Sequence, residues 1–140
     1  MVRTESPETR SKIMASIKSS NTVIEKKMDD ILLNLSVKFE MHPSEVYGKP
    51  DFIIRDRKIA VFCDGDFWHG YDIRNNPRLD VKKNREYWMK KIKANIRRDE
   101  DVNMRLEAEG WKVIRFWEHD INKNPEICWR TLMQSMEDLS

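Results

Sequence analysis

Apolar positions in the first third of the chain recur with helical spacing. A short helix is predicted over residues 7–18, where Ser6-Pro7 is typical of an N-cap followed by proline at the first helical position. A stronger helix is predicted over about residues 22–35. Its apolar side chains fall on one side: Ile24, Met28, Ile31, Leu32 and Leu35.

Strand patterns follow these helices. Short apolar runs predict strands at residues 37–41, 52–54 and 58–63, and the turn-prone Arg55-Asp56-Arg57 between the last two favours a meander. Residues 65–80 form a long irregular connection, and connections of that length inside compact domains tend to be functional.

The second half of the chain returns to helical spacing. The longest periodic segment covers about residues 81–109 and ends at Gly110, a C-cap signal. A strand is predicted over residues 112–117, and Asn124-Pro125 opens a last helix. The order α, α, β, β, β, α, β, α predicts an α/β fold with a mixed sheet flanked by helices.

The size and composition favour one domain. The 140 residues are 39% hydrophobic, enough for one modest core, so we expect residues 1–140 to form a single domain with residues 1–20 as its N-terminal helix or arm. No stretch approaches the roughly 18 apolar residues of a membrane span, and the N-terminus is polar. Cys63 and Cys128 lack the paired spacing of a zinc module. We therefore expect a cytoplasmic protein in a reducing compartment, with no membrane partner.

Positive charge is concentrated in one block. The whole chain carries 26 Lys and Arg against 24 Asp and Glu, but residues 82–98 carry eight basic side chains and one acidic. Within this block, five basic residues lie off the apolar face of the predicted helix: Lys90, Lys91, Lys93, Arg97 and Arg98. A basic helix face is often simply solvated, yet this density makes contact with DNA phosphates a serious hypothesis.

An acidic residue interrupts the apolar stripe of the same helix. The stripe is made by Trp88, Ile92, Ile96, Val102 and Leu106. Asp99 falls in the middle of it, with Asn95 one turn earlier. A carboxylate in that place is costly unless it is paired, hydrogen-bonded or facing a solvated cleft. Asp99 is therefore either a paired core aspartate or a functional group.

Two further acids stand at the ends of neighbouring predicted strands. Asp51 precedes one apolar strand, and Asp64 follows the next. A meander brings such ends together, and paired carboxylates suit a hard cation such as Mg²⁺. Glu25 has two interpretations, because Thr22 to Glu25 matches a capping box, while the side chain also borders the apolar stripe and is free to project toward the strand ends.

An aromatic segment follows the second acid. Phe67, Trp68 and His69 are compatible with ordinary core packing. Aromatic side chains in a loop beside a basic helix are also what a protein needs to stack on bases or wedge between them.

These motifs occur together in one known family. From about residue 9 to residue 119 the chain resembles the very-short-patch-repair (Vsr) mismatch endonucleases. The resemblance is carried by motifs that occur in order: Arg10-Ser11, Met14, Thr22 and Glu25, Gly48-Lys49-Pro50-Asp51, the run from Val61 to Gly70, Asn84 to Trp88, Arg98-Asp99, and Gly110 to Glu118. It implies a restriction-endonuclease-like fold and Mg²⁺-dependent nicking of one DNA strand next to a thymine mispaired with guanine, the lesion left by deamination of 5-methylcytosine.

The resemblance also implies residue roles. Asp51 would be the main ligand of two Mg²⁺ ions, with the main-chain carbonyl of Cys63 as a second ligand. His69 would act at the scissile phosphate or its water, and Asp99 would orient the imidazole or help place the nucleophile. Glu25 and Asp64 would complete the site. Four side chains would enter the mispaired duplex: Phe67, Trp68 and Trp88 from one groove and Met14 from the other.

The chain departs from the family pattern in places. Asp64 stands where the best-known members have histidine. Tyr71-Asp72 replaces the His and Cys that hold a structural zinc in the family, so no zinc is expected.

Two alternative functions stay open: the same nuclease core with a homing or restriction-type target, and a catalytically inactive DNA-binding module. Mismatch-repair proteins as partners, and action as a monomer, are expectations from the family.

Overall fold

A four-stranded mixed sheet forms the centre of the protein in a computed structural model. The structure describes residues 7–66 and 85–137, with the backbone alone for residues 7–14, 16–20 and 85. The strands are β1 (Glu40–Met41), β2 (Phe52–Ile54), β3 (Ile59–Asp64) and β4 (Lys112–Trp117), in the order β1-β2-β3-β4. The first three are antiparallel neighbours, and β4 runs parallel to β3. The meander and the predicted α/β class are confirmed.

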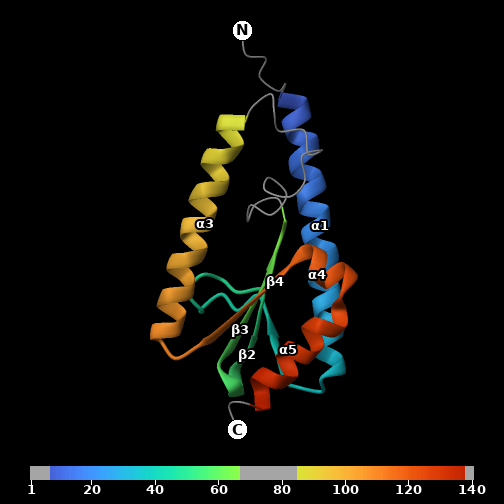
Figure 1. The fold of residues 1–140 in the computed structure, drawn as a ribbon, viewed down its shortest axis with the longest axis vertical. Helices are drawn as coiled ribbons and strands as arrows, with labels where there is room; N and C mark the ends of the chain where they lie inside the picture. Colours follow the sequence, from blue (N-terminus) through green and yellow to red (C-terminus); the bar gives the residue numbers. More distant parts are fainter. Residues whose placement is uncertain (1–6, 67–84, 138–140) are drawn as a thin grey trace.

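Helices cover both faces of this sheet (Figure 1). Helices α1 (Pro7–Asn34), α4 (Glu118–Lys123) and α5 (Pro125–Glu137) lie on one face, and α3 (Arg85–Ala108) lies on the other. Side chains along β3 alternate between the two layers: Ile59 and Val61 join the core under α1 and α5, while Ala60 and Phe62 join the core under α3. Since β3 is buried on both faces, its ends are fixed relative to helices on both sides.

The two N-terminal helices of the sequence prediction are one continuous helix, α1. The capping-box match at Thr22 suggested a new helix start. Serine, asparagine and threonine nevertheless each cost less than about 0.7 kcal/mol in a helix interior, and no proline or glycine interrupts the segment. The buried side chains of Ile24, Met28 and Leu32 anchor the C-terminal half against the sheet. In Figure 1 the N-terminal parts of α1 and α3 extend beyond the same end of the sheet.

Other boundaries differ by less. The predicted strands over residues 52–54 and 112–117 have the bounds of β2 and β4. The strand predicted over residues 37–41 is confined to the two residues of β1. The short helix α4 was not predicted, because its six residues carry one buried apolar side chain, Ile121, too little for a periodic pattern. Among the described residues, no helix has both the length and the apolar character needed to span a bilayer.

Candidate active site

The segment that precedes β2 holds Asp51 at the centre of the site. Gly48 has a φ of 78° and lies against α3, so close that a Cβ there would stand 2.4 Å from Cγ1 of Val102. Lys49 follows with a φ of 50°, and Pro50 is buried. Glycine at position 48 is therefore required both by the positive φ and by the close approach of the helix.

The side chain of Asp51 is half-buried. Its Oδ2 accepts a 2.7 Å hydrogen bond from the backbone N–H of Cys63 in β3. The pKa of Asp51 is raised to about 7: burial is the largest cause, the hydrogen bond from the Cys63 N–H opposes it, and the nearby Glu25 carboxyl adds to the rise. Among the described residues, the groups around Asp51 thus disfavour its charged form.

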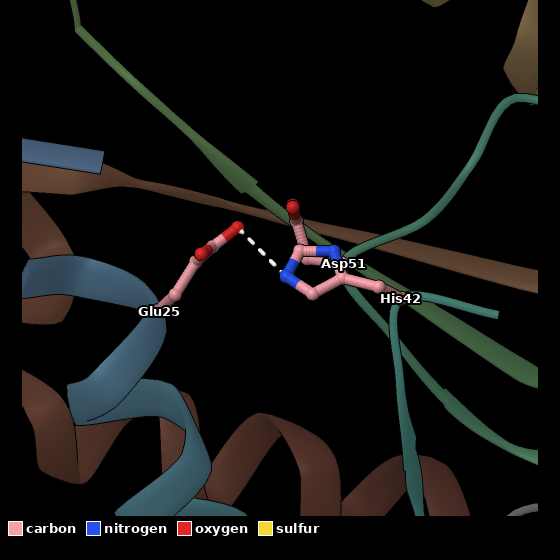
Figure 2. A group of neighbouring side chains, drawn as sticks. All are labelled: Glu25, His42 and Asp51. Atoms are coloured by element: carbon pink, nitrogen blue, oxygen red, sulfur yellow. Dashed lines mark ion pairs between the residues drawn. The ribbon is translucent and has the colours of Figure 1, made fainter. Parts of the chain in front are cut away.

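Three side chains from separate segments meet at this carboxylate (Figure 2): Glu25 of α1, His42 just after β1, and Asp51. One ligand atom of each lies within 4.8 Å of the others, and His42 Nε2 stands 3.4 Å from Glu25 Oε1. Because α1 runs straight through Thr22, no helix begins there, and the capping interpretation of Glu25 is wrong. Its side chain instead reaches the strand ends, as the alternative interpretation held.

The acids predicted from the strand ends and the long helix share one cavity of about 260 Å³. Asp51, Asp64 and Asp99 all line it, together with Asn95 and Arg98 of α3. Asn21 of α1 also lines the cavity, and its buried Oδ1 has no hydrogen-bond partner among the described residues. The cavity is therefore polar and able to receive a ligand that donates hydrogen bonds.

Arg115 of β4 holds two of these acids together. Its Nη1 lies 3.0 Å from Asp64 Oδ1 and 3.5 Å from Asp99 Oδ1, and its Nε donates a 2.7 Å hydrogen bond to Asn103 Oδ1. The guanidinium also stacks 4.0 Å over the ring of Phe62. Asp99 is a paired carboxylate, which is how its place in an apolar stripe is tolerated.

Sequence reasoning missed His42 and Arg115. His42 lies in a segment without periodicity, nine residues before Asp51. Arg115 did leave a signal, because it is a charged residue between Ile114 and Phe116 in an otherwise apolar strand. The roles of His42 and Arg115 depend on contacts with residues that are distant in the sequence.

The chain leaving β3 is anchored to α1 and α4. A Cβ on Gly65 would stand 2.7 Å from Oδ1 of Asn21. The backbone N–H of Asp66 donates a 3.1 Å hydrogen bond to Glu118 Oε1, and its buried carboxylate lies 3.0 Å from Nδ1 of His119. These contacts fix the point from which the predicted aromatic segment departs.

Several expectations fall outside the described residues. Phe67, Trp68, His69 and Tyr71-Asp72 are not described, and neither is the side chain of Met14. Their roles, and the expectation of no zinc, stay predictions. The role of the Cys63 carbonyl as a metal ligand also stays a prediction.

The long helix separates into a packed face and a charged face. Trp88 is 1% exposed, with Tyr87 edge-on to its ring at 4.9 Å between centroids. This burial favours a packing role for Trp88, and the expectation that it enters the DNA duplex stays a prediction. Lys90, Lys91, Lys93 and Arg97 are all exposed, as their position off the stripe predicted.

The mixed sheet flanked by helices, with acids gathered around one cavity, defines an α/β protein with a restriction-endonuclease-like core. Residues 4–75 match the family model described as DNA mismatch endonuclease Vsr. The chain is 42% identical over 132 residues to the "Type II nicking enzyme V.NmeDIP" of Neisseria meningitidis serogroup C, covering 94% of this chain and 88% of that relative.

Two further relatives agree. The "Type II nicking enzyme V.HpaIIP" of Haemophilus parainfluenzae is 41% identical over 86% of this chain and 85% of its own length. The "DNA mismatch endonuclease Vsr" of Escherichia coli K12 is 30% identical over 93% of this chain and 82% of its own length. The chain belongs to the Vsr family and is a DNA endonuclease.

Proposed function

We propose that this endonuclease uses a divalent cation, Mg²⁺, to nick one strand of duplex DNA next to the thymine of a T:G mispair. The observation that carries the metal dependence is the convergence of Glu25, His42 and Asp51 beside an acid-lined cavity. Mismatch recognition is supported by the family description and by the name of the E. coli relative. Nicking of one strand is supported by the names of the other two relatives.

The residues present fit a divalent cation. Asp51 is half-buried, has a raised pKa and lies beside a second carboxylate, Glu25, so a cation there would balance the negative charge of the two groups. Asp51 and Glu25 would hold it through carboxylate oxygens, and the Cys63 carbonyl is proposed as a further ligand. When bound, the cation would supply positive charge that stabilises the developing charge on the phosphate and makes a water molecule more acidic.

Two other acids in the cavity have a different task. Asp64 and Asp99 both contact the Arg115 guanidinium, so their negative charge is already partly balanced. We propose that Asp64 shapes the wall of the cavity and that Asp99, on α3, orients His69 near the scissile phosphate. His69 would then hold or move a proton at that phosphate.

DNA binding is proposed to involve the basic face of α3. Its exposed lysines and Arg97 would neutralise phosphates, while Arg98 reaches the cavity itself. Phe67, Trp68 and Met14 are proposed to enter the duplex at the mispair, where unstacking costs less than at a matched pair.

Strand-specific nicking tests this proposal. End-labelled duplexes that differ only in one T:G or T:A pair are incubated with Mg²⁺ or with EDTA, and Asp51→Ala serves as the inactive control. We expect Mg²⁺-dependent nicking of the thymine strand in the T:G duplex alone, with DNA binding preserved in Asp51→Ala.

The other outcomes separate the alternatives. Nicking of both duplexes would retain the endonuclease and replace the mismatch target with a homing or restriction-type site. Tight binding without nicking in either duplex would instead indicate a DNA-binding module. For Trp68→Ala, we expect a larger loss of binding on the T:G duplex than on the T:A duplex, because wedging is selective for the weaker pair.

A further inference from the structure

We propose that His42 is a direct ligand of the catalytic cation, through Nε2, and so gives this site a nitrogen donor beside its carboxylate oxygens. The inference rests on the proposed metal dependence and deepens it. His42 is the one member of the three-residue group that neither the sequence motifs nor the family resemblance assigned.

The backbone places His42 at the end of the β1–β2 ladder. The paired residues Met41 and Phe52 are the last of that ladder, and the next step brings His42 opposite Asp51. There the N–H of His42 donates a 2.9 Å hydrogen bond to the carbonyl oxygen of Asp51. The two residues are thus tied together through the main chain, and movement of one is coupled to the other.

The conformation of His42 is unusual for a residue with a side chain. Its φ is 50°, in the left-handed region, and buried Pro43 follows directly. Such conformations are uncommon for residues other than glycine, although histidine, asparagine and aspartate adopt them more readily than most, and they occur often at functional sites. Here the conformation directs the imidazole toward Glu25 and Asp51 (Figure 2).

Exposure and charge fit a ligand better than a packed histidine. The His42 side chain is 52% exposed, whereas that of Glu25 is 27% exposed. The ring therefore stands at the open side of the group, with Nε2 facing the Glu25 carboxylate. A neutral imidazole adds a donor atom without adding a third negative charge to the two carboxylates.

The chemical consequence is a change in metal preference. Imidazole nitrogen binds Co²⁺ and other later first-row ions better than Mg²⁺, which prefers oxygen ligands. A site with one nitrogen and two carboxylates is expected to retain Mg²⁺ while binding Mn²⁺ and Co²⁺ more tightly than an all-oxygen site would.

Pulsed EPR of Mn²⁺ bound to the 140-residue chain tests this directly, because a coordinated imidazole gives a resolved coupling to ¹⁴N. The test variant is His42→Asn, since asparagine tolerates the left-handed conformation and is too short to replace the ring. His119→Asn is the matched control, and His69→Asn identifies any signal from the other predicted site histidine. Far-UV circular dichroism confirms that each variant is folded.

We expect the ¹⁴N coupling in the wild type and in His119→Asn, and its loss in His42→Asn with about tenfold weaker Mn²⁺ binding. A coupling that persists in His42→Asn, or is lost only in His69→Asn, overturns the inference. Mn²⁺ binding without any ¹⁴N coupling in the wild type does the same. The EPR outcomes decide only whether His42 is a ligand. The proposed metal dependence is tested separately by the nicking assay, where nicking without Mg²⁺ would overturn it.

A second variant tests the donor atom. His42→Gln replaces the imidazole nitrogen with an amide oxygen at similar reach. We expect titration calorimetry to show a larger loss of affinity for Co²⁺ than for Mg²⁺, by about tenfold. Equal losses for the two ions would mean that His42 only supports Glu25 and is not a ligand.

Discussion

The backbone N–H of Cys63 donates a 2.7 Å hydrogen bond to Oδ2 of Asp51. Asp51 precedes the first paired residue of β2, and Cys63 lies near the end of β3. The Asp51 side chain therefore adds one hydrogen bond between the two strands just beyond their backbone pairing. The bond also fixes one carboxylate oxygen relative to the sheet and leaves the other for Glu25, His42 and a cation. A substitution that removes both side-chain oxygens, such as Asp51→Ala, therefore changes both the strand junction and the charge of the site.

Asp51→Asn is predicted to make the metal-free protein more stable above pH 7. Because the folded pKa of Asp51 is about 7, against an ordinary value of 3.8, the folded protein retains a proton that the unfolded chain releases. Stability of the wild type thus falls as pH rises between these values. Asparagine does not titrate and still accepts the Cys63 hydrogen bond, so we expect a gain on the order of 2 kcal/mol above pH 7.

Urea unfolding in EDTA between pH 4 and pH 8 measures this difference. It should shrink toward zero at the acidic end, and Mg²⁺ should reduce it at pH 8 by binding the wild type alone. Asp56→Asn, at an exposed turn position, is the matched control. A pH dependence of Asp51→Asn parallel to that of the wild type would show that burial does not raise the pKa of Asp51.

Arg115→Met is predicted to destabilise the fold by about 2 to 3 kcal/mol, because it leaves Asp64 and Asp99 facing each other without a cation. The side chains of Arg115 and Asp64 are only 17% and 10% exposed, so water screens this pair weakly. Thermal or urea unfolding at pH 7.5 provides the measurement. Cleavage should fall as well, since Asp99 loses the contact that holds it at the cavity wall.

Two variants show whether charge is the cause. Asp64→Asn combined with Arg115→Met should restore part of the lost stability, because one uncompensated carboxylate is removed. Arg55→Met, which breaks an exposed contact with Glu40 and Glu45, should have a much smaller effect. Equal losses for Arg55→Met and Arg115→Met would indicate that Arg115 contributes through packing of its stem.

How far the sequence predicts this protein depends on whether the signal is local. Phe52 to Ile54 and Lys112 to Trp117 are dense in β-branched and aromatic residues, and their bounds were predicted as they are found. The break between the two halves of α1 was wrong, since weak local preferences near residue 20 are outweighed by packing further along the helix.

The site was predicted where an acid interrupts an apolar pattern. Asp51, Asp64 and Asp99 each stand at a strand end or within an apolar stripe, and the fold brings all three to one cavity. His42 has no such pattern around it, and its position opposite Asp51 depends on strand register. The partners of Arg115 lie on β3 and α3, so its role requires the parallel pairing of β4 with β3.

Trp88→Ala is predicted to destabilise the protein by about 3 to 5 kcal/mol, as expected for removal of a fully buried tryptophan. Thermal unfolding measures this loss, and Trp88→Phe should lose much less because most of the apolar volume is kept. Binding of Trp88→Phe to T:G and T:A duplexes should fall equally or not at all. A selective loss on the T:G duplex, with stability unchanged, would instead support the predicted DNA-inserting role for Trp88.

Lys90→Ala combined with Lys93→Ala is predicted to weaken DNA binding equally on matched and mismatched duplexes. Both side chains are exposed on α3, and each phosphate contact that is lost removes the release of about one counterion. Fluorescence anisotropy at a series of salt concentrations should therefore give a slope of log Kd against log salt that is shallower by about two. Lys123→Ala, on α4 at the other face of the sheet, should leave the slope unchanged. A slope that is unchanged in the double variant would mean that DNA approaches the cavity without contacting this face of α3.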